Sequence, residues 1–264
     1  MIAQTLSVAS LLFMTLTQAS YAADFTNYNV IDKDTRVRVE NTTVKPYQAI
    51  TFLTMAWDND GAACTGSVIG PNKVLTAAHC VYDPKKGGLA KSTTLEPGLN
   101  AKYQPYSKFI STHVRVPQQY IEKQQSDYDI AIIDVQPSAG ASIGKVVKPF
   151  ELETANDFTG KDFEVAGYPS DKFKVFPGPT MWKDIGVVDR QEGNKAYYTA
   201  DASHGQSGAP LFDKTTHKLF GVHTSYVKGK NTESNRGTTL TDEIYNWVKP
   251  VSYTHLTLPT SDLV

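Results

Sequence analysis

The sequence predicts an all-β fold, a sandwich or a barrel, that ends in one helix. Short runs rich in β-branched and aromatic residues recur along the chain, and Pro, Gly, Asn and Asp separate them. Helical periodicity stands out in one place, near the C-terminal end. The 264 residues are 40% hydrophobic and 20% charged, which is typical of a globular protein with a sizeable core.

Examples of the predicted strands, in chain order, are TRVRVE, AITFLTMAW, KVLTAAHC, THVRV, YDIAIIDV, FEVAGYP, AYYTA and KLFGVHTSYV. The predicted helix is TDEIYNWVK, in which Thr241 can cap the N-terminus and Ile244, Trp247 and Val248 fall on one face. Residues 136–149 are rich in small and turn residues and divide the strands into two similar sets. This stretch is a candidate link between two barrels.

Residues 1–22 are predicted to be a signal peptide. An apolar stretch from Leu6 to Leu16 is followed by SYA, which ends at Ala22 and has the small residues that signal peptidase accepts. The stretch is too short to span a bilayer, which takes about 20 apolar residues. We therefore expect export, cleavage after Ala22, and no membrane contact afterwards.

Residues 251–264 are excluded from the fold. Their first ten residues, VSYTHLTLPT, resemble the translation of a transposase adapter used in sequencing libraries, and we interpret the segment as an artefact.

The chain has two cysteines, Cys64 and Cys80. An exported protein reaches an oxidising compartment, so a disulfide between them is expected, with free buried thiols as the alternative. A structural zinc site of the usual kind would need two histidines at matching spacing, and none is near them. The formal charge is −1, from 26 basic and 27 acidic residues, so no broad basic face for nucleic acid or anionic membrane is implied.

Three local patterns suggest chemistry. LTAAHC places His79 beside Cys80, where a disulfide would limit the drift of a general base. YDIAII places Asp129 at the start of an apolar run, where a partly buried carboxylate needs a donor such as an imidazole N–H. Asp127 is the second candidate, outside the apolar run.

The third pattern is HGQSGAPLF. Gly205 permits a tight turn in which its own N–H and that of Ser207 converge on one point, as an oxyanion hole requires, and Ser207 would be the nucleophile. An α/β-hydrolase elbow would need G-x-S-x-G, but Ala209 occupies the last position.

His79, Asp129 and Ser207 follow one another in the order His, Asp, Ser, each within its own pattern. With CTGSVIGPNKVLTAAHCVY, DYDIAII, GYP, ASHGQSGAPLF, GVHTS and NRGTTLTDEI, the chain resembles the chymotrypsin-like serine endopeptidases, and within them the glutamyl endopeptidases of staphylococci and bacilli. The resemblance extends from about Val30 to Lys249.

This resemblance implies a double six-stranded β-barrel with a C-terminal helix. It also implies peptide hydrolysis through an acyl-enzyme, with Ser207 as nucleophile, His79 as base and then acid, and Asp129 as the residue that orients His79. No cofactor and no metal are needed for this chemistry. Protein or peptide substrates and a monomer are expected, without nucleic acid.

The resemblance implies a specificity pocket lined by Asp201 and Ala202, before the nucleophile, and by His223, Thr224 and Ser225 in GVHTSYV. His223 matches the position where glutamyl endopeptidases place a histidine against the substrate carboxylate, so glutamate is expected before the scissile bond and aspartate less favoured. Ala202 stands where those enzymes usually offer a hydroxyl.

Two features bear on that choice. NYN followed by VIDKDTRV resembles the staphylococcal processing site, which implies a propeptide at residues 23–29 and a mature N-terminus at Val30, whose α-amino group would favour an acidic guest. Asp201 matches the aspartate with which trypsin-like enzymes receive Lys or Arg, although we favour a hydrogen-bonded turn residue there. The alternatives are therefore cleavage after Lys or Arg and a non-catalytic, protease-like binding protein.

Overall fold

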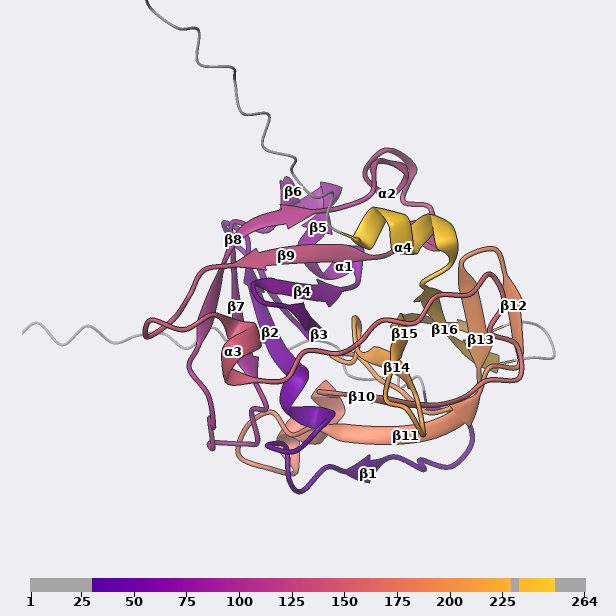
Figure 1. Cartoon of the computed structure of the whole chain (residues 1–264), viewed down its shortest axis with the longest axis horizontal. Helices are drawn as coiled ribbons and strands as arrows, with labels where there is room; N and C mark the ends of the chain where they lie inside the picture. The colour runs from indigo at the N-terminus through magenta and orange to yellow at the C-terminus, as the bar shows by residue number, and fades with distance from the viewer. Residues whose placement is uncertain (1–29, 229–232, 250–264) are drawn as a thin grey trace, which may run out of the picture.

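The computed structural model describes residues 30–228 and 233–249. The predicted signal peptide, the predicted propeptide up to residue 29 and residues 251–264 lie outside the described residues. Figure 1 shows two β-structures side by side, built mainly from the first and the second half of the chain, with helix α4 returning to the first. The expected all-β architecture is confirmed.

The first half is a closed antiparallel barrel. Its strand order is β2-β3-β4-β9-β8-β7. The strands are β2 (Ile50–Ala56), β3 (Gly61–Gly70), β4 (Lys73–Thr76), β7 (Ser92–Pro97), β8 (Phe109–Arg115) and β9 (Ala131–Val135). Fully buried Leu53, Val74, Leu95 and Ile132 fill its interior. This barrel has the six strands expected for the first half, whereas the second half contains eight.

The second half is an eight-stranded antiparallel sheet in the order β1-β11-β10-β14-β15-β16-β13-β12. The strands are β1 (Val37–Arg38), β10 (Asp162–Gly167), β11 (Trp182–Val187), β12 (Arg190–Glu192), β13 (Lys195–Tyr198), β14 (Pro210–Asp213), β15 (Leu219–Lys228) and β16 (Glu233–Thr239). The sheet brings β11 close to the end of β13, since the Asp201 N–H, just after β13, donates to Asp184 Oδ2 on β11 at 2.7 Å. Phe163, Val165, Leu211 and Phe220 are buried within it.

Strand β1 joins the N-terminal segment to the second half of the molecule. It lies at the edge of the second sheet, where Val37 is opposite Lys183 of β11, although it precedes the whole first barrel in the sequence. The N-terminal segment is therefore carried into the half of the molecule that contains Ser207.

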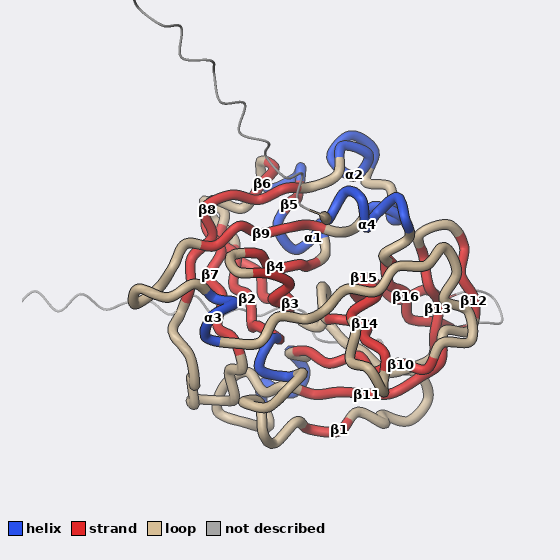
Figure 2. The backbone as a smooth tube through the Cα atoms, viewed as in Figure 1, coloured by secondary structure: helices blue, strands red, loops and turns tan. Residues whose placement is uncertain are grey.

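Short elements connect the strands, as Figure 2 shows. They are the helices α1 (Ala78–Val81), α2 (Gln118–Lys123) and α3 (Ile143–Val146), the 3₁₀ turns η1 (Tyr47–Ala49), η2 (Pro84–Lys86), η3 (Ser126–Tyr128) and η4 (Ser170–Lys174), and the small hairpin of β5 (Tyr82–Asp83) and β6 (Gly88–Leu89). The predicted strand KVLTAAHC is shorter than expected. Its pairing with β9 ends at Thr76, and the rest forms α1.

The predicted C-terminal helix is α4 (Asp242–Val248), and the Thr241 hydroxyl caps it by accepting a hydrogen bond from the Ile244 N–H at 3.4 Å. Ile244 and Val248 are buried in the same core cluster as the first barrel. Among the helices of the described part of the chain, none has the length and apolar character needed to cross a membrane.

Candidate active site

His79 lies on α1, directly after the barrel strand β4. The neighbouring Cys80 is joined to Cys64 of β3 by a disulfide with an S–S distance of 2.05 Å, which is the predicted pairing. Two covalent routes, the chain and the disulfide, therefore tie this one-turn helix to the barrel wall. His79 keeps 34% of its side chain exposed, so one face of the ring remains accessible.

Asp129 holds His79 at two atoms. Its Oδ2 lies 2.7 Å from His79 Nδ1, and its Oδ1 accepts a hydrogen bond from the His79 backbone N–H at 3.0 Å. Asp129 is 7% exposed and sits just before β9, the strand that pairs with β4. Asp127 instead forms an ion pair with Lys195, at 3.0 Å. The structure thus brings Asp129 rather than Asp127 to His79.

The Asp129 carboxylate sets the pKa and the tautomer of the His79 imidazole. Burial by itself lowers the pKa of His79, but the charge and the hydrogen bond of Asp129 outweigh it, so that the pKa of His79 is raised from 6.5. With its Nδ1–H directed at Asp129, the neutral ring has its lone pair on Nε2. His79 can therefore accept a proton there.

Ser207 belongs to the second half of the molecule but contacts the first. Its carbonyl oxygen accepts a hydrogen bond from the Thr65 N–H on β3 at 2.9 Å and lies 3.6 Å from Cys80 Sγ. The ligand atoms of Cys64, His79 and Cys80 lie within 4.8 Å of one another. Ser207 therefore sits against the disulfide, beside the helix that carries His79.

A tight turn from Ser203 to Gln206 leads into Ser207. The Gln206 N–H bonds to the Ser203 carbonyl at 2.9 Å, and Gly205 has a φ of +91°. A Cβ on Gly205 would lie 2.3 Å from the Tyr168 carbonyl oxygen, so both the conformation and the packing require glycine.

The same turn presents free backbone donors. The Ser170 N–H holds the His204 carbonyl at 2.7 Å, and in a trans peptide the following Gly205 N–H points the opposite way. Within residues 30–228 and 233–249, neither the Gly205 nor the Ser207 N–H has a hydrogen-bond acceptor in the protein. Both predicted oxyanion donors therefore lack an acceptor within this part of the protein.

His223 lies on β15 and is 2% exposed. Its Nδ1 is 2.7 Å from the hydroxyl of Tyr198, on β13. Burial, with a smaller contribution from the charge of His79, lowers the pKa of His223 to about 3. The expected cationic donor is thus a neutral ring, and when the Tyr198 hydroxyl donates to Nδ1 the proton of that ring resides on Nε2. No sequence pattern distinguishes Tyr198 from the other residues of the predicted strand AYYTA.

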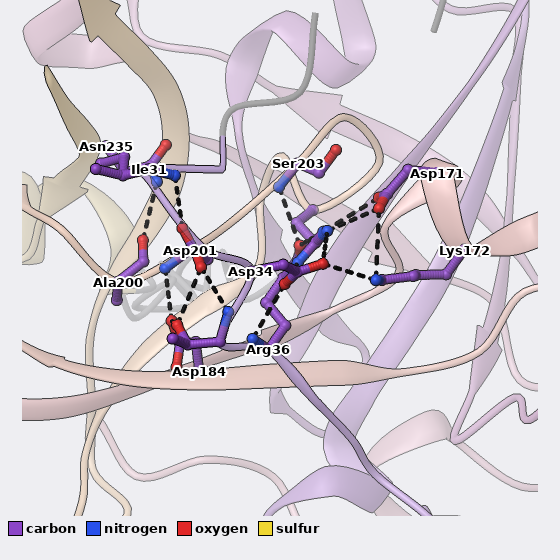
Figure 3. Close-up of polar contacts among 12 residues, drawn as sticks. Ile31, Asp34, Arg36, Asp171, Lys172, Asp184, Ala200, Asp201, Ser203 and Asn235 are labelled. Carbon is purple, nitrogen blue, oxygen red and sulfur yellow. Dashed lines mark hydrogen bonds and ion pairs between the residues drawn. The ribbon is translucent and has the colours of Figure 1, made fainter.

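The Asp201 carboxylate is occupied by the N-terminal segment. Its Oδ1 accepts from the Ile31 N–H at 2.8 Å, and its Oδ2 accepts from the N–H and the hydroxyl of Thr35 at 2.8 and 3.0 Å. Figure 3 shows these contacts, and Asp201 is only 1% exposed. Val30, directly before Ile31, is half-buried near this point, and Ala202 is fully buried.

The remaining pocket candidates follow His223 on β15. The Thr224 hydroxyl donates to the Arg236 carbonyl at 3.3 Å, and the Ser225 hydroxyl accepts from Arg236 Nε at 3.0 Å. Ser225 stays half-buried at a bulge in the pairing between β15 and β16. Arg236 is a second contributor to this region that no sequence pattern singled out.

Cys64, His79 and Cys80 form the one group in the described ranges with ligand atoms close enough to hold a metal ion. The two sulfurs are joined in a disulfide, so neither is the thiolate that a metal binds. This group does not suit a metal centre.

Comparisons with known proteins agree with this geometry. The family model described as Trypsin matches residues 34–248. The glutamyl endopeptidase of Bacillus licheniformis is 32% identical over 236 residues, which cover 85% of this chain and 71% of that protein. A protein named extracellular metalloprotease from Bacillus subtilis is 30% identical over 223 residues, with 83% and 68% covered.

A solved structure of a Glu endopeptidase in complex with MPD superposes with a TM-score of 0.75 and 31% identity, covering 83% of this chain and 97% of that one. The match includes both halves of the fold and the segments that carry His79, Asp129 and Ser207. This chain therefore belongs to the trypsin family of serine endopeptidases.

Proposed function

We propose that this chain is a secreted endopeptidase that hydrolyses peptide bonds after glutamate through an acyl-enzyme on Ser207. The observation that carries the proposal is the pair of hydrogen bonds that Asp129 accepts from His79. They lie next to the disulfide, whose Cys80 Sγ is 3.6 Å from the Ser207 carbonyl oxygen. Such a pair is expected of a general base that is fixed in one tautomer and one orientation.

In the proposed reaction, Ser207 Oγ attacks the carbonyl carbon of the substrate while its proton passes to His79 Nε2. The negative oxygen of the tetrahedral intermediate accepts hydrogen bonds from the free Gly205 and Ser207 N–H groups. His79 then gives its proton to the leaving amine, and an acyl-enzyme remains. Water, deprotonated by His79, attacks this ester and releases the second product. No cofactor enters these steps.

The preference for glutamate rests on His223. Its Nδ1 is engaged by Tyr198, so a neutral His223 would offer its Nε2–H to an anionic guest. A charged imidazole in the empty pocket is not required, because a bound carboxylate would itself stabilise the proton on the ring. Aspartate, one methylene shorter, would reach this donor less well.

The rival preference for Lys or Arg relies on Asp201. Three hydrogen bonds from Ile31 and Thr35 already satisfy that carboxylate, and it is almost fully buried. A free ammonium at Val30, as the proposed removal of residues 23–29 would create, would lie one residue from Ile31 and add positive charge to this region. Both points favour an acidic guest.

Two other classes are disfavoured by particular observations. The name of the Bacillus subtilis relative suggests a metal-dependent protease, but the disulfide between Cys64 and Cys80 removes two of the three potential ligands. A silent binding protein would have no need for two unpaired N–H groups beside a serine.

The test is a peptide-library digest by the mature protein beginning at Val30, with every cut identified by mass spectrometry. Ser207→Ala should abolish all cuts, since loss of this nucleophile lowers kcat about 10⁶-fold in related chemistry. His223→Ala should remove cuts after Glu, whereas His113→Ala, an exposed histidine on β8, should leave them unchanged. Cuts after Lys or Arg that disappear in Asp201→Asn would support the rival pocket, and no cuts at all would favour a binding protein.

A further inference from the structure

One arginine of the N-terminal segment is buried beside the turn that leads to Ser207. The Arg36 side chain has 0% exposure and bonds to Asp34 and to Asp171 of η4, with an Nη2 to Oδ2 distance of 2.7 Å to Asp171. Its Nη1 also donates to the side-chain oxygen of Gln206 at 3.3 Å. Gln206 immediately precedes the proposed nucleophile, so this distant arginine contacts the residue next to Ser207.

Gln206 stabilises the turn from inside. Its backbone N–H bonds to the Ser203 carbonyl at 2.9 Å, and its side-chain Oε1 accepts from the Ser203 N–H at 3.0 Å. The side chain is fully buried, and its Nε2 has no hydrogen-bond partner in the described part of the molecule. The contacts through Oε1 therefore decide its orientation, and Arg36 supplies one of them.

Arg36 also reaches the other side of the turn. Its partner Asp171 follows Ser170, whose N–H holds the His204 carbonyl at 2.7 Å and so orients the His204–Gly205 peptide. Arg36 is thus connected to the turn at both of its sides. Asp171 and the adjacent Ser170 link it to His204, and Gln206 links it to the other side of the turn. Figure 3 shows Arg36 between Asp34 and Asp171, close to Ser203.

The charges around Arg36 keep it ionised. Burial opposes the charge, but the hydrogen bonds from the guanidinium to Asp34 and Asp171 raise its pKa above the ordinary arginine value. Two carboxylates surround the single charge of Arg36, and Lys172 supplies a second positive charge by donating from Nζ to Asp34 at 2.7 Å. A guanidinium has five donors in a fixed plane, and Arg36 uses them for two bonds to Asp34, two to Asp171 and one to Gln206, which the three donors of a lysine could not reproduce.

We propose that Arg36 is a positioning residue that holds the Gly205 and Ser207 N–H groups in the orientation required for an oxyanion, acting through Gln206 and Asp171. The proposal rests on the function assigned above, because only an acyl-transfer site needs those two donors. It differs from a general structural role, since it predicts a selective loss of binding to tetrahedral species.

The experiment compares Arg36→Gln with Arg38→Gln in the mature enzyme. Arg38 is two residues along the same segment, but it lies over Phe176 and bonds to Asn100, away from the turn. For each variant, kcat and KM are measured on a peptide containing Glu, per active site titrated. Affinities are measured for a peptide boronic acid, which forms a tetrahedral adduct with serine, and for a product peptide ending in Glu.

Arg36→Gln should lower kcat and boronate affinity about 10- to 100-fold, because losing one oxyanion donor outright lowers kcat about 10²- to 10³-fold and a displaced donor loses part of that. KM and product affinity should change less than about threefold, and Arg38→Gln should resemble the wild type. Equal kcat and boronate affinity in the two variants, or equal losses for boronate and product, would overturn the proposal.

Gln206 provides a second route if Arg36→Gln does not fold. Gln206→Met removes the acceptor and should reproduce the selective loss, whereas Gln206→Glu keeps an acceptor for Arg36 and for the Ser203 N–H and should retain most of kcat. Hydrogen exchange over residues 203–208 adds a readout that needs no turnover, with faster exchange expected in Gln206→Met. If the wild type exchanges slowly there but cuts no peptide, the proposed function fails while the role of Arg36 in ordering the turn stands.

Discussion

The two parts of the candidate site are fixed by different means. His79 and Asp129 both come from the first barrel, where a disulfide and a strand pairing between β4 and β9 hold their backbones together. The turn before Ser207 depends on residues 31–36, which are up to 170 positions away in the sequence and bond to Asp201 and Gln206. The base is thus positioned within one compact barrel, while the nucleophile depends on how the N-terminal segment docks.

Asp129→Asn would break the first part with the largest effect. The amide keeps the shape but no longer fixes the Nδ1–H tautomer, and the corresponding change in serine proteases lowers kcat about 10⁴-fold. Single-turnover and steady-state kinetics on a Glu-containing peptide would measure it. Asp127→Asn is the matched control, because its carboxylate pairs with Lys195 instead. A similar loss in both variants would show that the wrong aspartate has been assigned.

Replacing the disulfide would test whether the barrel alone can hold His79. In Cys64→Ala/Cys80→Ala, a loop closed over 16 residues is released, and a loop of that length is expected to contribute about 3 kcal/mol to the free energy of unfolding. Urea unfolding monitored by tryptophan fluorescence measures the loss. The kcat of the folded fraction should fall less than in Asp129→Asn, because the two hydrogen bonds that Asp129 accepts from His79 remain. A fall as large as that of Asp129→Asn would mean that the cross-link itself positions the base.

Thr35→Val would perturb the second part. The Thr35 hydroxyl lies between two buried carboxylates, 2.8 Å from Asp184 Oδ2 and 3.0 Å from Asp201 Oδ2. Removing the hydroxyl takes one hydrogen-bond donor away from these two carboxylates and should reduce the free energy of unfolding by about 1–3 kcal/mol. The substitution Thr43→Val changes an exposed hydroxyl that bonds to Asn41 and should have little effect. Thermal unfolding of both variants decides whether the N-terminal segment contributes stability as well as order.

The same contrast explains which features the sequence could predict. His79, Asp129 and Ser207 each lie in a short pattern whose meaning is local, an apolar strand or a glycine turn, and the C-terminal helix has its cap and its buried face in nine consecutive residues. Arg36, Gln206 and Tyr198 were not identified, because each acquires its role from a partner 25 to 170 positions away. Strand β11 is one of the strands that the quoted sequence runs do not include. Its Ile185 is 54% exposed although Asp184 is buried, so its polarity runs against the usual strand pattern.

Asp201 illustrates why residue type alone is a weak guide to specificity. A carboxylate six positions before the nucleophile matches the basic-residue pocket of trypsin-like enzymes, and the contacts that satisfy it come from Ile31 and Thr35 at the other end of the chain. No local sequence pattern distinguishes an aspartate whose carboxylate is free to bind a substrate from one whose carboxylate already accepts hydrogen bonds from the protein.

The smallest effect is expected in the pH dependence of the wild type. His79 must be neutral to accept the proton of Ser207, and Asp129 raises the pKa of His79 above 6.5, so the acid limb of kcat/KM should lie above pH 6.5. His223 should contribute nothing to this limb, since its pKa of about 3 leaves it neutral throughout. In Asp129→Asn the raising influence is gone and burial still lowers the pKa of His79, so the limb should move to lower pH while the plateau falls. A limb that stays in place in Asp129→Asn but moves in His223→Ala would assign the titrating group to the second half of the site.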